Sequence, residues 1–252
     1  MGKKVTLDAN GVYYRQLNEQ IREAVRNGAD EIELLNVRGQ RYIGNAIDKP
    51  VRFTVNGVPG QDMAAFMRGA FIRVEGNAQD GVANTMDDGQ IEINGMAGDV
   101  LGYGMRGGRV MVKQDVGYRV GIHMKAYMDK SPVIVAGGKA GDFLGEYMAG
   151  GAIILLGMDS TMPVETPITG RSLGTGMHGG VIYIRGDVPE YQLGPGLSFH
   201  PLEDEDIAFI RKHVEDWASA FGKDADEVMA GTFRKVQPFS KRPYGNMYVG
   251  TN

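Results

Sequence analysis

The stretch Gly98-Asp99-Val100-Leu101-Gly102-Tyr103-Gly104-Met105-Arg106-Gly107-Gly108 decides the fold, because its pattern returns along the chain. Methionine recurs three times at a constant spacing of nineteen positions and then after two longer gaps, at Met67, Met86, Met105, Met124, Met148 and Met177. Glycine stands seven and three positions before most of these methionines, as in the pairs Gly98 and Gly102, Gly117 and Gly121, Gly141 and Gly145, and Gly170 and Gly174. A fixed period of this length indicates a stacked structural repeat.

Short apolar runs lie between the glycine blocks. In Ile91 and Ile93, or Val110 and Val112, alternate residues are apolar and often β-branched, which is typical of strands. One repeat unit is too short to hold a strand–helix–strand crossover, but it can hold short strands joined by glycine corners. We therefore predict an all-β core: a right-handed parallel β-helix, a single-stranded solenoid of about seven turns between residues 51 and 186. The six methionines should fill one interior column and the eight glycines should form corners.

Both ends of the chain carry helical patterns that could cover the open edges of such a solenoid. The apolar spacing predicts helices over residues 10–28 and 202–222, and Asp224 with Glu227 resembles the start of a third, short helix. The prediction divides the chain into an N-terminal helical cap (1–35), a glycine-repeat β-helix (36–200), and C-terminal helices with an extended tail (201–252). The tail from residue 237 is either an arm that docks on a partner or a loose terminus.

Composition excludes several classes of function. The 252 residues contain 27 Lys and Arg against 31 Asp and Glu, for a formal charge of −4. This balance gives no basic surface for nucleic acid or an anionic membrane, and no apolar run is long enough to span a bilayer. Cysteine is absent, which excludes a cysteine nucleophile and cysteinyl iron–sulfur ligands on this chain. We expect a cytoplasmic protein.

No motif predicts a catalytic residue, a cofactor site or a metal site. Residues 102–107 and 174–179 match a dinucleotide fingerprint, but a strand rather than a helix should follow each, so they are interpreted as corners. An independent enzyme, with a site built from His123, Asp142, Arg171 and His178, is the alternative hypothesis. Two insertions, residues 126–132 and 158–169, must bulge from the rod and are interpreted as contact surface.

Several segments resemble the carboxy-terminal glycine-repeat domain, also called the GXGXG domain, of the glutamate synthase large subunit. They are residues 55–61, 72–78, 98–108 and 141–151, with Asn36 and residues 41–44 upstream at a shifted spacing and residues 210–213 and 226–238 downstream. The resemblance covers nearly the whole chain. One of the subunits of formylmethanofuran dehydrogenase has similar glycine repeats, but the flanking segments favour glutamate synthase.

The resemblance implies a division of labour between chains. In that family an amidotransferase domain releases ammonia from glutamine, and an FMN domain with an iron–sulfur cluster reduces 2-iminoglutarate. The glycine-repeat domain braces the two without catalytic residues. We therefore expect a non-catalytic scaffold subunit, with an amidotransferase subunit and an FMN-dependent synthase subunit as partners, and a homo-oligomer is also possible. The corresponding subunit of N-methylglutamate synthase, and a formylmethanofuran dehydrogenase-type scaffold, are alternatives.

Overall fold

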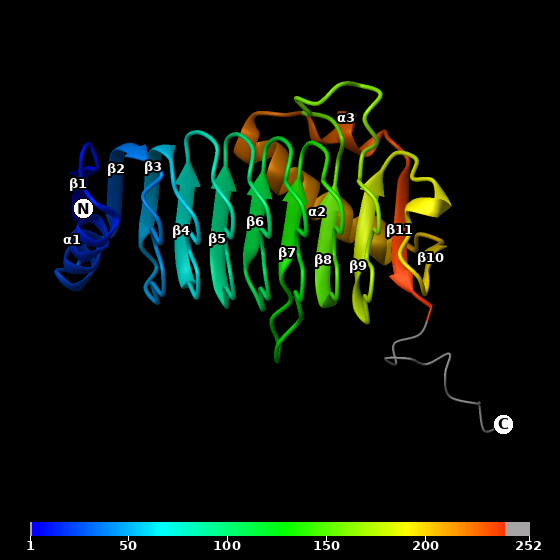
Figure 1. Cartoon of the computed structure of the whole chain (residues 1–252), viewed down its shortest axis with the longest axis horizontal. Coiled ribbons are helices and arrows are strands. Elements are labelled where there is room, and N and C mark those ends of the chain that lie inside the picture. Colours follow the sequence, from blue (N-terminus) through cyan, green and yellow to red (C-terminus); the bar gives the residue numbers. More distant parts are fainter. Residues whose placement is uncertain (1, 240–252) are drawn as a thin grey trace.

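The computed structural model describes residues 2–239 as a rod built from one continuous sheet (Figure 1). Nine parallel strands follow one another along it, and an antiparallel pair closes the C-terminal end. The elements are β1 (Lys4–Asp8), α1 (Tyr14–Arg26), β2 (Glu31–Arg38), β3 (Arg52–Val58), β4 (Arg68–Val74), β5 (Asp88–Ile93), β6 (Arg109–Val112), β7 (Val133–Ala136), β8 (Ala149–Leu155), β9 (Gly179–Arg185), η1 (Glu190–Gln192), β10 (Leu197–His200), α2 (Asp204–Phe221), α3 (Ala225–Met229) and β11 (Phe233–Pro238).

The strand register reproduces the sequence repeat. Phe71 of β4 pairs with Gln90 of β5, and Gln90 pairs with Arg109 of β6, so each step equals one repeat unit of nineteen positions. The steps from β6 to β7 and from β8 to β9 are longer by five and ten positions, which places the two insertions between strands. The predicted parallel β-solenoid is confirmed, with about six turns rather than seven.

The interior of the solenoid is a single apolar column. Alternate residues of each strand point inward, such as Ile91 and Ile93 of β5, and all of them are buried in one cluster. The six repeat methionines belong to the same cluster, and five of them have no exposed surface: Met67, Met86, Met105, Met124 and Met148, with Met177 at 5%. A flexible thioether can fill the irregular space where a strand meets a corner, which accounts for methionine at this position.

The corners before each methionine use an unusual backbone, in which every second residue has positive φ. In the central copy these residues are Val100 (51°), Gly102 (72°) and Gly104 (57°). Their N–H groups donate alternately along the rod: Val100 to the carbonyl of Tyr118 on the next turn, and Gly102 to the carbonyl of Val82 on the previous one. Left-handed backbone costs a non-glycine residue about 1–2 kcal/mol, so the alternating glycines stabilise this ladder.

Other repeat glycines make room for an aspartate of the preceding turn. Oδ1 of Asp80 accepts the N–H of Asp99 at 2.9 Å, and a side chain on Gly98 would collide with that same oxygen. Asp99 and Gly117 repeat the arrangement one turn later, as do Asp142 and Gly170. These carboxylates accept hydrogen bonds from backbone N–H groups between turns.

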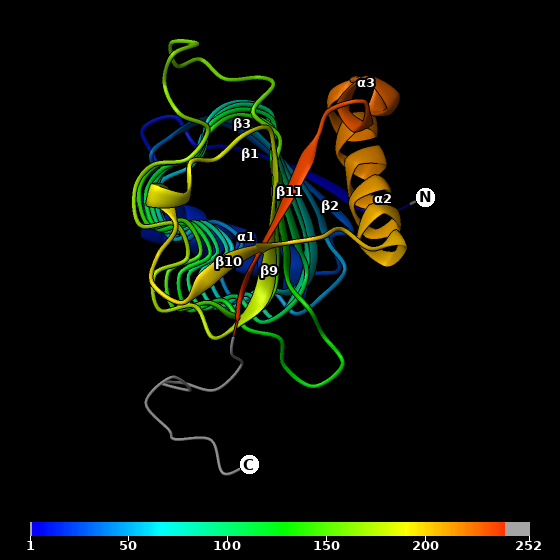
Figure 2. The same cartoon turned by 90° about the vertical axis from the view of Figure 1, so that its right-hand side faces the viewer.

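The two main helices have different roles. Helix α1 lies at the N-terminal end of the rod, where Leu17 and Ile21 join the interior core (Figure 1). The prediction that the C-terminal helix covers the opposite end is wrong: α2 runs along one side of the rod, over the outer face of β6 to β9 (Figure 2). The C-terminal edge is covered instead by β11, which pairs antiparallel with β9 and with β10.

A change in the outward-facing residues explains this position. Near the N-terminal end they are polar, as in Arg73 of β4 and Glu92 of β5, whereas Met111, Val135 and Ile154 on later strands are apolar. Helix α2 buries these apolar residues beneath its own, and the indole Nε1 of Trp217 donates to the carbonyl of Val112 at 2.9 Å.

The strands β1, β2, β10 and β11 also were not predicted. Most of the predicted tail lies outside the described residues.

Candidate functional site

The structure does not bring the four candidates for an independent active site together. The imidazole of His123 stacks on the ring of Tyr147 at 5.2 Å, on the corner face of the solenoid. Asp142 accepts a hydrogen bond from the backbone N–H of Arg171 at 2.7 Å, which is an inter-turn bond of the fold. His178 follows the methionine column, and its N–H donates to the carbonyl of Met148. Asp142 and Arg171 are therefore neighbours through a bond of the fold, and no hydrogen bond joins either of them to His123 or His178 in the part of the chain that the structure describes.

The first insertion forms a hairpin loop, residues 126–132, that projects from the rod between β6 and β7. Tyr127 and Lys130 close it by exchanging backbone hydrogen bonds of 3.0 and 3.1 Å. Lys130 also pairs with Asp88 of β5 at 3.1 Å, which ties the loop to the rod. Met128 at its tip is 85% exposed. The first insertion is therefore a braced loop with a solvent-exposed apolar side chain at its tip.

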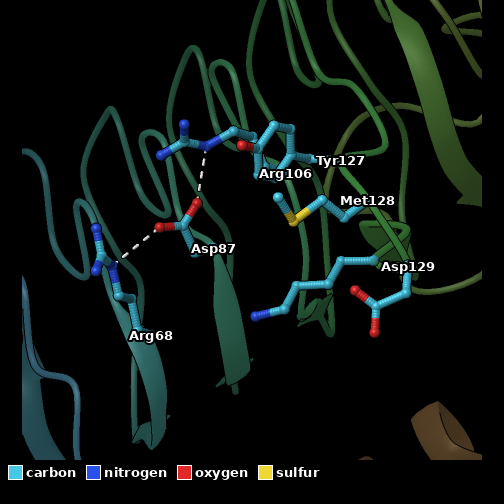
Figure 3. A pocket seen from close by; sticks show the side chains of 7 residues that line it. Arg68, Asp87, Arg106, Tyr127, Met128 and Asp129 are labelled. Carbon is cyan, nitrogen blue, oxygen red and sulfur yellow. Dashed lines mark ion pairs between the residues drawn. The ribbon is translucent and has the colours of Figure 1, made fainter.

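A hollow of about 360 Å³, lined by charged side chains together with Tyr127 and Met128, lies between this loop and the rod (Figure 3). Asp87 lines the hollow and pairs with Arg68 on one side at 3.0 Å and with Arg106 on the other at 2.8 Å. These three residues directly follow successive repeat methionines, so the stacking of turns aligns them. The ring of Tyr127 lies 5.8 Å from the guanidinium of Arg106. The hollow offers charged and aromatic groups for recognition.

The second insertion forms an upper loop, residues 158–169, on a different corner of the rod (Figure 2). Its tip residue Val164 is 96% exposed. Lys139, itself only 7% exposed, holds the loop from below: its ammonium donates to the carbonyls of Pro163 and Thr166 at 2.7 Å and of Val164 at 3.3 Å. The loop is thus organised around a buried cation that the chain itself supplies.

Asp115 anchors the start of the same loop. Its carboxylate accepts the N–H of Lys139, and the N–H and hydroxyl of Thr161, at 2.7 to 2.8 Å. Burial opposes ionisation of Asp115, but these hydrogen bonds outweigh it and hold the pKa of the carboxyl below its usual value. Asp115 therefore stays charged at neutral pH and keeps the loop in place.

The described residues, 2–239, contain no group of three or more His, Asp and Glu side chains placed to hold a metal ion. No helix among them has the length and apolar character needed to cross a bilayer. The two projecting loops and the hollow beside the hairpin loop form the candidate functional site, because they combine exposed apolar tips with a row of paired charges. Both insertions were predictable from the longer methionine gaps, whereas Lys139, Asp115 and the row formed by Arg68, Asp87 and Arg106 were not predicted.

Comparison with known proteins identifies the relatives of this chain. Residues 15–241 match the model of the GXGXG motif family. The chain is 46% identical to the uncharacterised protein MJ1350 of Methanocaldococcus jannaschii over 98% of its length, which covers 97% of that protein. It is 29% identical, over 73% of its length, to the ferredoxin-dependent glutamate synthase 2 of a Synechocystis strain, and 24% identical, over 76%, to the NADH glutamate synthase of Schizosaccharomyces pombe.

The lengths of these relatives differ greatly. The matched region makes up 12% of the Synechocystis glutamate synthase and 9% of the Schizosaccharomyces pombe protein, so this chain spans a small part of each. The similarity to glutamate synthases inferred from the repeats is confirmed. Because the family model covers nearly all of the described residues, the chain belongs to the GXGXG motif family.

Proposed function

We propose that this protein is a non-catalytic scaffold subunit of a glutamate synthase-type complex. The observation that carries the proposal is the match of 73% of the chain to a segment that is only 12% of a ferredoxin-dependent glutamate synthase. In the proposal, the amidotransferase and the FMN and iron–sulfur synthase centres belong to other chains of the same cytoplasmic complex. The absence of cysteine from the 252 residues is compatible with this, because glutaminase nucleophiles and cluster ligands are cysteines.

The shape of the candidate site supports a bracing role. The hairpin loop and the upper loop leave different corners of the rod, and each presents an exposed apolar tip, Met128 and Val164. Both loops are tied back to the rod through charged groups, by Lys130 to Asp88 and by Lys139 to loop carbonyls. A rigid element with two separate contact points can hold two catalytic subunits in fixed relative positions, which transfer of ammonia between them requires.

Affinity purification of this protein from its native host tests the proposal. We expect an amidotransferase and an FMN protein with iron–sulfur clusters to co-purify, and the complex to convert glutamine and 2-oxoglutarate to glutamate. Removal of this subunit should uncouple glutamine hydrolysis from glutamate formation. Recovery of the protein without such partners, or unchanged coupling in its absence, would contradict the proposal.

Matched variants locate the contacts. Met128→Glu and Val164→Glu place a charge at each loop tip and should each weaken co-purification, while thermal unfolding stays unchanged. Tyr191→Glu, at a residue 82% exposed and outside both loops, is the control.

Preference for methylamine over ammonia would identify N-methylglutamate synthase, and molybdenum or tungsten in the complex would identify a formylmethanofuran dehydrogenase-type assembly. The named relatives favour glutamate synthase over both.

A further inference from the structure

Strand β1 forms an edge of the sheet that is open among residues 2–239. It pairs only with β2, in parallel, with Val5 opposite Ile32 and Leu7 opposite Leu34. Val5 and Leu7 point into the interior, whereas Lys4, Thr6 and Asp8 lie on the outer face and are exposed. An edge strand with unpaired backbone groups is a template for another strand.

The hydrogen bonds to β2 show which backbone groups of β1 remain free. The carbonyl of Lys3 accepts from Asp30 at 2.9 Å, and the N–H of Ala9 donates to Leu35 at 2.8 Å. In an extended strand the N–H and C=O of one residue point to the same side, and this side alternates along the chain. The backbone groups that face β2 are therefore those of odd-numbered residues, and Lys4, Thr6 and Asp8 direct theirs away from the rod.

The core beneath this edge is incompletely covered. Ile32 and Leu34 of β2 are buried, with at most 1% of their surface exposed. Val5 and Leu7, one strand further out, are only partly buried although they belong to the same apolar layer. Helix α1 lies at this end of the rod, and Val5 and Leu7 stay partly exposed beside it (Figure 1). Another strand beside β1 would bury the remaining apolar surface.

We propose that the strand that occupies this edge is β1 of a second copy of the chain. The two strands pair antiparallel about a two-fold axis that passes between their Thr6 residues. In this register Thr6 faces Thr6, Lys4 faces Asp8 and Val5 faces Leu7 of the other copy. All three residues with free backbone groups then exchange hydrogen bonds, and Val5 and Leu7 of both copies continue one apolar layer. A two-fold interface must be self-complementary, and this strand is.

The charges on β1 select this partner and register. In the antiparallel pair, Lys4 of each copy lies opposite Asp8 of the other, whereas a parallel pair would place lysine opposite lysine and aspartate opposite aspartate. Lys4 uses one donor on Glu33 at 2.9 Å and has two others available. Oδ1 of Asp8 accepts from Asn10 and Asn36, and within residues 2–239 its Oδ2 has no partner. Both groups can therefore bond across the interface without giving up an existing contact.

Light scattering on the purified chain tests the dimer, with an expected mass of twice 27.3 kDa. Thr6→Pro removes the N–H at the two-fold axis, and proline is tolerated where a strand edge faces solvent. This variant should be monomeric with an unchanged circular dichroism spectrum. A wild-type chain that is monomeric at every concentration, or a Thr6→Pro variant that remains dimeric, would overturn the proposal.

Disulfide trapping tests the register, because the chain has no cysteine of its own. In Thr6→Cys the two Cα atoms should lie about 5.5 Å apart, within the range that a disulfide spans. In the control Lys4→Cys the two positions should be about 14 Å apart. We expect covalent dimers from Thr6→Cys alone under mild oxidation, and equal cross-linking of both variants would refute the register. The test needs no partner subunit, so its outcome is separate from that of the scaffold proposal.

Discussion

Acid should weaken the attachment of α2 to the rod, because that helix buries a histidine. His213 is 6% exposed, and its ring lies 4.5 Å from that of Phe209. No partner for its Nδ1 exists among residues 2–239. Burial, followed by the positive charges of Lys212 and Arg109, lowers the pKa of His213 from 6.5 to about 4, and Asp216 opposes this only in part.

The direction of this pH effect on stability follows from proton uptake by His213. Between about pH 6.5 and pH 4 the unfolded chain binds a proton at His213 that the folded chain does not, so the free energy of unfolding falls as pH falls. The contribution is intact above about pH 6.5, and the difference between the two pKa values corresponds to a loss of about 3 kcal/mol by pH 4.

The assay is urea unfolding across this pH range, followed by the emission of Trp217. This residue is the only tryptophan of the chain, is 1% exposed and stands four positions after His213 on α2. Carboxylates also titrate in this range, so the informative quantity is the difference between the wild type and His213→Leu. The variant should lose about 3 kcal/mol less than the wild type by pH 4. If the wild type and His213→Leu lose stability in parallel, His213 does not govern this pH dependence. The matched control is the substitution of another histidine, His200→Gln.

Two further predictions concern the column and the upper loop. Met105→Ala should cost about 2–5 kcal/mol in urea unfolding because it leaves a cavity at a residue with no exposed surface, whereas Met105→Leu should cost less than about 1.5 kcal/mol; similar losses would contradict an interior column. Lys139→Met removes the hydrogen bonds to the carbonyls of Pro163, Val164 and Thr166. A local loss of about 2 kcal/mol should speed proteolysis of the upper loop about 30-fold with little change in global unfolding, and an unchanged rate would show that the loop is held by other contacts.

Much of the rod was predictable because its repeat is local. Each strand is marked by two alternate apolar residues, such as Val110 and Val112, and the stacking of turns follows once the constant methionine spacing is found. The glycines were predictable as corners, but their alternating left-handed backbone was not. Val100 shows why: a β-branched residue at φ 51° is rare in proteins, and its N–H reaches the carbonyl of Tyr118 on the next turn only once the turns have stacked.

The position of α2 was missed, although the sequence contains a signal for it. The solvent-facing residues of a solenoid are usually polar, so Met111, Val135 and Ile154 at outward positions indicate a covered face. The inward residue pairs alone predict the rod but carry no information about which outer face a helix covers. The edge strands were missed for a different reason: β1 and β10 have no repeat column, since their neighbours differ from those of a regular turn.

The candidate functional site depends on residues distant in sequence, which limits what spacing can reveal. Arg68, Asp87 and Arg106 become neighbours only because turns stack, and they could have been read from the register as a column of opposite charges. Lys139 is different. Nothing in its own turn marks it as a loop anchor, because its partners are backbone carbonyls of residues 163 to 166, whose positions depend on the path of the loop.

The bonding between turns explains how a narrow rod can carry such loops without losing its shape. Each turn is tied to both neighbours twice: by strand pairing on one wall, and at the corner by N–H groups that donate alternately to the next and the previous turn. Because each turn contacts only the adjacent turns, the fold tolerates an insertion wherever the chain leaves a turn and returns to the same strand register. The insertions after β6 and β8 do this, since Val133 and Val181 return to the register of Arg109 and Ala152. The bases of the two loops are therefore fixed about 10 Å apart along the rod, two turns of the sheet spacing, whatever sequence forms their tips. A fold of this kind can change its contacts while it preserves the distance between them, which is the property that a brace between two enzymes requires.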